Sequence, residues 1–95
     1  MAIAVISDAP NVGAEQFQAV QQQLNLTANP PQGGLALLAG PWAGSWRVLN
    51  VWESQEAWET FRRDRLEPAF QQLGFPMPQF QVWPLEALML SPKQP

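Results

Sequence analysis

The chain has 95 residues and a formal net charge of -3, and it contains no histidine, cysteine or tyrosine. These absences exclude disulfides, zinc sites built on Cys or His, histidine-ligated haem and Ser-His-Asp hydrolysis. The five basic side chains are too few for a phosphate-tracking surface, so we expect no nucleic-acid partner. The N-terminus lacks the features of a signal peptide, and no apolar run approaches the roughly 18 residues that span a bilayer. A cytoplasmic protein with no membrane partner is therefore expected.

The first quarter of the chain predicts a strand and a helix. Residues 2–7 form a short apolar run rich in Ile and Val, and residues 8–11 have turn chemistry. From Gly13 on, one apolar stripe recurs at helical spacing, opposite a face rich in Gln. Either Asn11 or Gly13 is expected to cap this helix. The stripe consists of Ala14, Phe17, Val20 and Leu24.

A hairpin is predicted next. Residues 29–34 contain paired Pro and paired Gly, which cannot continue a helix. Residues 35–39 form an apolar run, residues 40–44 are expected to turn the chain, and residues 45–52 resume an extended pattern. These features predict two paired strands.

The second helix is the best-supported element. Ser54 suits its N-cap, and an apolar stripe follows on one side until Gly74 stops the helix. Pro68 predicts a kink or break near residues 65–67, because it lacks a donor and its ring crowds the preceding turn. Residues 80–90 alternate as a long last strand that is apolar on both faces, with Pro84 in its middle.

This order predicts an α+β fold: a ferredoxin-like βαββαβ domain over residues 1–95, with an antiparallel four-stranded sheet and two helices on one face. Strands that are apolar on both faces indicate that both faces of the sheet are buried. One chain of this size has no third layer to cover the second face. We therefore expect a homodimer through the open sheet face, with Leu88 of the last strand at the interface.

Four segments resemble a known group of proteins. They are the strand-to-helix run Trp46-Arg-Val-Leu-Asn-Val-Trp-Glu-Ser-Gln-Glu-Ala-Trp-Glu-Thr-Phe61, the run Arg65-Leu-Glu-Pro-Ala69, the loop with Pro76 and Pro78, and the last strand. Together they resemble the dimeric α/β-barrel superfamily, and within it the antibiotic biosynthesis monooxygenase-like (ABM-like) domains. The superfamily includes cofactor-independent oxygenases, haem-degrading enzymes, isomerases and members without known activity. The resemblance therefore implies the fold and leaves the reaction open.

The resemblance also argues against haem. The haem-degrading branch carries an Asn on the first strand and a Trp and a His on the second helix. The first strand here has no Asn, Phe61 stands near the place of the Trp, and Gln71 stands near the place of the His. We expect neither a cofactor nor a metal.

The oxygenase branch implies a dry pocket between sheet and helices, where polar side chains hold a developing oxyanion. Asn50 and Trp52 are expected on one face of the third strand and Arg47 on the other. Asn50 and Arg47 are the catalytic candidates, and Asn50, Trp52, Trp58 and Phe61 are the candidate ligand-binding residues. The alternatives are an Asn50 satisfied by backbone or water, aromatic rings that only fill the core, and an Arg47 paired with Glu53, Glu86 or a second subunit.

Three functions remain open at this point. The favoured one is an ABM-like dimeric barrel that binds a small apolar or aromatic molecule between sheet and helices. The first alternative is a cofactor-independent monooxygenase or isomerase acting on an aromatic or polyketide-type substrate. A general base is hard to find for it, and Glu86 would serve only if it were buried. The second alternative is a non-catalytic protein-interaction module.

Overall fold

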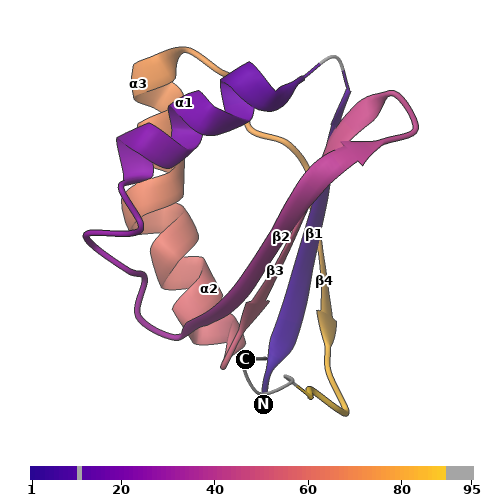
Figure 1. Cartoon of the computed structure of the whole chain (residues 1–95). Helices are drawn as coiled ribbons and strands as arrows, with labels where there is room; N and C mark the ends of the chain where they lie inside the picture. The colour runs from indigo at the N-terminus through magenta and orange to yellow at the C-terminus, as the bar shows by residue number, and fades with distance from the viewer. Residues whose placement is uncertain (11, 90–95) are drawn as a thin grey trace, which may run out of the picture.

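The computed structural model describes residues 1–10 and 12–89. Four antiparallel strands form one sheet in the order β2-β3-β1-β4. The helices all lie against one side of this sheet, and the other side is left open (Figure 1). The elements are β1 (Ile3–Pro10), α1 (Ala14–Leu24), β2 (Gly34–Trp42), β3 (Ser45–Trp52), α2 (Gln55–Phe61), the π-helical turn η1 (Arg62–Leu66), α3 (Glu67–Leu73) and β4 (Phe80–Pro84). The predicted ferredoxin-like α+β fold is confirmed.

The strand register assigns each side chain to one face of the sheet. Residues opposite one another in neighbouring strands share a face, so Val5, Asn50 and Leu37 point to the helices together. The next residues along each strand point to the open face. That face carries Ala4, Ile6, Asp8, Ala36, Leu38, Gly40, Arg47, Leu49, Val51, Gln81 and Trp83.

The core lies between the helical face of the sheet and the helices. It joins Ile3 and Val5 of β1 and Trp52 of β3 to side chains of every helix. The helical contribution includes the predicted stripes, with Val20 and Leu24 from α1 and Trp58, Phe61, Leu66 and Ala69 from the second helical stretch. Among the described residues, no helix is long and apolar enough to cross a membrane.

The hairpin is tighter than expected. Strand β2 continues to Trp42, and only Ala43 and Gly44 connect it to β3. Both have positive φ (47° and 80°), as in the two-residue turns that match the twist of paired strands. The prediction of a turn over residues 40–44 was therefore wrong. Pro41 is tolerated within β2 because this strand lies at the sheet edge, where a missing N–H need not cost a ladder bond.

The outer strands also differ from their predicted lengths. Strand β1 runs on to Pro10, because Asp8, Ala9 and Pro10 pair with the long hairpin strand β3. Strand β4 ends at Pro84 rather than at residue 90. Leu88 thus lies beyond the strand that was expected to carry it, whereas Leu90 and Asn11 lie outside the described residues.

The second helical stretch begins after Ser54 and ends at Gly74, as predicted, and its irregular turn lies at Arg62–Leu66. The Ser54 hydroxyl accepts from the Ala57 N–H at 3.1 Å, and Gly74 ends α3 in the left-handed conformation. The irregularity is a widened turn in which the Glu67 N–H donates to the Arg62 carbonyl. Such a π turn makes room for Pro68, whose ring would clash with a carbonyl four residues earlier in a regular helix.

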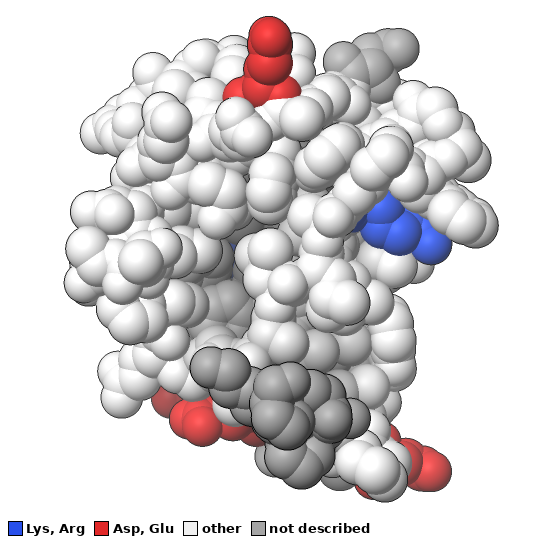
Figure 2. Space-filling view, in the orientation of Figure 1, with Lys and Arg blue, Asp and Glu red and all other residues white. Residues whose placement is uncertain are grey.

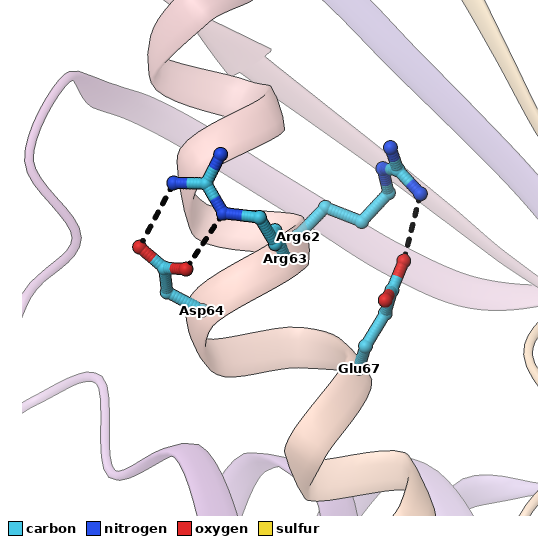
Figure 3. Close-up of polar contacts among 4 residues, drawn as sticks. All are labelled: Arg62, Arg63, Asp64 and Glu67. Atoms are coloured by element: carbon cyan, nitrogen blue, oxygen red, sulfur yellow. Dashed lines mark hydrogen bonds and ion pairs between the residues drawn. The ribbon is translucent and has the colours of Figure 1, made fainter.

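The arginines of this stretch have separate partners. Arg62 pairs with Glu67 and Arg63 with Asp64, at 2.7 Å and 2.8 Å. Figure 3 shows the two guanidinium groups leaving the helix on different sides, each toward its own carboxylate. Arg65 instead donates to the backbone carbonyls of Leu24 and Asn29, at 2.9 Å and 2.8 Å. It thereby ties the end of α1 and the following loop to η1.

Candidate ligand-binding cavity

A cavity of about 830 Å³ lies between the sheet and the helices. Its floor is the helical face of β1, β2 and β3, and its walls come from α1, α2, η1, α3 and the segment from Phe75 to Phe80. Figure 2 shows a hollow on the face of the molecule that is turned to the viewer. The described atoms around this hollow are mostly neither basic nor acidic. The volume falls in the range of pockets that hold a small organic molecule.

Four of the sequence-predicted residues meet at this cavity. Asn50 and Trp52 belong to β3, Trp58 and Phe61 to α2, and all four line the space. Period-two alternation places Asn50 and Trp52 on the same face of β3. The start of α2 at Ser54 then turns Trp58 and Phe61 back toward that face.

Asn50 is a polar residue of the cavity floor. Its Oδ1 accepts a hydrogen bond of 3.1 Å from Nε1 of Trp52. An indole N–H can only donate, so the atom facing it must be the amide oxygen and the other atom must be the NH2 group. Nδ2 of Asn50 has no hydrogen-bond partner among the described residues, and it is not one of the polar atoms sealed from solvent there. The amide therefore offers two N–H donors at the cavity.

Aromatic rings form one end of the cavity. The ring centroid of Trp52 lies 5.8 Å from that of Trp58 and 5.0 Å from that of Phe61. Phe80 stacks edge-on against Trp58 at 5.0 Å. Tilted and edge-on contacts at these separations are the favourable ones for aromatic pairs. The rings thus hold one another in place and give this end rigid, apolar walls.

Other lining residues were not among the predicted site residues. Ser7 is 9% exposed and lies opposite Val48 on the cavity floor. Phe17 of α1 contacts Trp46 of β3 with tilted rings, whose centroids are 5.5 Å apart. The apolar stripe of the first helix already placed Phe17 toward the core, whereas the first strand was predicted only as an apolar run. The sequence does not give the distance between the sheet and the helices, and this distance decides whether such residues fill a core or line a cavity.

Arg47 lies on the open face, away from the cavity. It forms a two-pronged ion pair with Asp8, with nitrogen–oxygen distances of 2.7 Å and 2.9 Å, and its guanidinium lies 4.9 Å from the Trp42 ring centroid. Hydrogen bonding to Arg47 lowers the pKa of the Asp8 carboxyl from its usual value, against an opposing effect of desolvation. Within the described chain Asp8 fills the role that was expected of Glu53 or Glu86. Trp42, expected in a hairpin loop, is the last residue of β2.

The described residues provide little for proton transfer or metal binding at the cavity. Glu86 is exposed, which removes the condition under which it would serve as a base. Asp8 is among the residues that border the cavity, but its carboxylate is paired with Arg47 on the open face of the sheet. Within residues 1–10 and 12–89, no group of three or more His, Cys, Asp or Glu side chains could hold a metal ion. The cavity offers hydrogen-bond donors and aromatic surface.

Sheet order and helix placement give the ferredoxin-like α+β fold, and solved structures of antibiotic biosynthesis monooxygenase-like proteins share it. A Mycobacterium tuberculosis protein superposes with a TM-score of 0.70 at 15% identity, over 94% of this chain and 100% of its own. A candidate antibiotic biosynthesis monooxygenase of Caulobacter crescentus gives 0.64 at 22% identity, over 93% and 91%. A variant of SnoaB, a cofactor-independent oxygenase of Streptomyces nogalater, gives 0.64 at 10% identity, over 95% and 97%.

These likenesses confirm the expected resemblance at the level of the fold. No protein-family model matches the chain, and no curated protein matches it in sequence. At identities of 10–22% the activity of a structural neighbour does not transfer with the fold. The function has to be argued from the cavity itself.

Proposed function

We propose that the protein binds a small, planar, largely apolar molecule in the cavity between the sheet and the helices. The observation that carries this proposal is the Asn50 amide, whose NH2 group has no partner among the described residues, set in a largely aromatic and aliphatic space of about 830 Å³. Pockets for small molecules combine a large apolar surface with a few placed polar groups in this way. Trp52, Trp58 and Phe61 would contact the faces and edges of such a ligand, and Asn50 would contact a polar atom on it.

A planar tricyclic probe tests this proposal. We expect fluorene to bind the protein in isothermal titration calorimetry, and we expect Val48→Phe to weaken binding at least tenfold by filling the cavity floor. Leu49→Phe is the matched control, because Leu49 is the next residue of β3 and faces the open side. Equal binding by both variants, or no binding by the wild type, would contradict the proposal.

A cofactor-independent oxygenase is the second candidate, and the orientation of Asn50 favours it. A donor that meets a developing oxyanion in a water-poor site stabilises it more than water would. Because the cavity supplies no free carboxylate or imidazole among its described residues, the substrate would have to ionise readily by itself. Oxygen uptake on adding anthrone, a tricyclic ketone that ionises at carbon, tests this activity. Oxygen uptake no faster than in buffer would contradict the oxygenase function, and ligand binding would remain as the proposed function.

The assembly proposed with this function is a homodimer through the open sheet face. Ile6, Leu49 and Leu38 form an apolar row across the three strands β1, β3 and β2, and the Leu38 side chain is 59% exposed. Trp83 adds a second large exposed side chain from β4, at 42%. Asp8 and Arg47, the charged groups assigned to this face, neutralise each other. A second copy of the chain would bury this row without leaving a charge unpaired.

A further inference from the structure

The hydrogen bond between Trp52 and Asn50 has a consequence for which ligands the cavity accepts. An asparagine amide can present either its oxygen or its NH2 group, according to how it is turned. Here the Trp52 indole, which only donates, lies 3.1 Å from Oδ1. Turning the amide over would place two donors against each other and leave the indole N–H without an acceptor.

The Trp52 side chain is in turn held firmly. It is 3% exposed and packs against the rings of Trp58 and Phe61. The indole therefore cannot easily follow a turned amide to find another partner. A buried donor left unpaired is costly, so the turned amide is disfavoured by roughly tenfold or more.

We propose that Trp52 is a positioning residue that holds the Asn50 NH2 group toward the cavity, so that the site selects ligands presenting a hydrogen-bond acceptor. A carbonyl or phenolate oxygen fits this requirement, whereas an N–H or O–H group that can only donate does not. The inference rests on the proposed function, because it concerns the ligand of the same cavity. It adds the chemical class of the polar group and the residue that imposes it.

Three molecules of nearly the same shape test the selection. Fluorenone presents a carbonyl oxygen, carbazole an N–H group and fluorene a CH2 group at the same position of a planar tricyclic frame. By calorimetry, wild-type protein should bind fluorenone roughly tenfold more tightly than carbazole, the ratio expected for a correctly paired against an opposed hydrogen-bonding group. Fluorene should lie between them.

The variant Trp52→Phe keeps an aromatic ring and removes the indole donor. The fluorenone-to-carbazole ratio should then fall toward one, since the freed amide can turn to suit either ligand. Trp58→Phe is the matched control: Trp58 is equally buried, and its indole takes no part in the bond to Asn50. It should weaken both ligands alike and leave the ratio unchanged. A ratio that survives Trp52→Phe would overturn the inference.

A second variant covers the case in which Trp52→Phe does not fold. In mildly alkaline buffer, Asn50→Asp keeps an acceptor for Trp52 but offers the cavity only acceptors, so the preference should reverse in favour of carbazole. An unreversed preference would again overturn the selection. The hydrogen bond between Trp52 and Asn50 can be tested directly by NMR. The chemical shift of the Trp52 indole N–H should change in Asn50→Ala, and an unchanged shift would contradict this hydrogen bond.

These outcomes separate the inference from the function beneath it. If wild-type protein binds fluorene but does not distinguish fluorenone from carbazole, the inference fails and the proposed function stands. If none of the three molecules binds, the proposed function fails and the ligand selection falls with it.

Discussion

Asp8 and Arg47 lie directly opposite each other on β1 and β3, and their side chains form a two-pronged ion pair on the open face of the sheet. The pair gives Arg47 a structural partner on the opposite side of the sheet from the cavity. It also makes the stability of the fold depend on pH.

We expect Asp8→Asn to be less stable than the wild type at neutral pH. The pKa of Asp8 is lowered in the folded protein, so its contribution is present above the unfolded-state pKa, near 3.8, and is lost as pH falls through the folded-state value. The difference in thermal unfolding temperature between wild type and variant should therefore shrink in strong acid. A difference that stays constant from neutral to strongly acidic pH would show that the ion pair is not its source.

The dimer proposal is tested at Leu38. Because its side chain is 59% exposed in the single chain, Leu38→Asp should leave the subunit folded. It should nevertheless dissociate a dimer that buries this side chain, since an unpaired charge in an apolar interface is costly. Sedimentation velocity measures the result. Val82→Asp is the control on the helix-facing side of the sheet, with an exposure of 40%; dissociation by both variants, or by neither, would contradict the proposed interface.

Arg65 is expected to stabilise the fold through two backbone carbonyls. Arg65→Met keeps much of the aliphatic side chain but leaves the Leu24 and Asn29 carbonyls without this donor. The free energy of unfolding should fall by about 1–3 kcal/mol, as for other hydrogen bonds made by a charged group. Chemical denaturation measures it. Arg63→Met, which removes a surface ion pair only, should cause no measurable loss, and an equal loss from both would refute the role assigned to Arg65.

Gly33 sets the loop that enters β2. Its φ is +83°, and an added Cβ would lie 2.7 Å from the Ala57 Cβ in α2. Gly33→Ala should destabilise the fold by about 1–3 kcal/mol, from left-handed backbone strain and the clash together. Gly40→Ala is the control, because a Cβ added there would meet nothing within 4 Å and the φ of Gly40 is not positive. A Gly33→Ala variant as stable as the Gly40→Ala variant would contradict this placement.

The sequence predicted best those features that depend on neighbours in the chain. Ser54 capping α2, the shared face of Asn50 and Trp52, and the stop at Gly74 all follow from local periodicity and capping chemistry. The same kind of argument predicted a kink or break near residues 65–67, whereas the structure has a widened turn over Arg62–Leu66.

Features set by distant partners were missed. The length of β1 depends on its pairing with β3, and the partner of Arg47 is 39 positions away in the chain. The cavity depends on how far the helices stand from the sheet, which no periodicity encodes. For this reason Asn50 was a candidate from sequence, but the direction of its amide required the position of Trp52.

The most direct test of the account is a crystal structure of the protein with bound fluorenone. The account predicts the tricyclic frame between the sheet and the helices, against Trp52 and Phe61, with its carbonyl oxygen accepting a hydrogen bond from Nδ2 of Asn50. Fluorenone on the open sheet face, or in the cavity with its carbonyl turned away from Asn50, would contradict it.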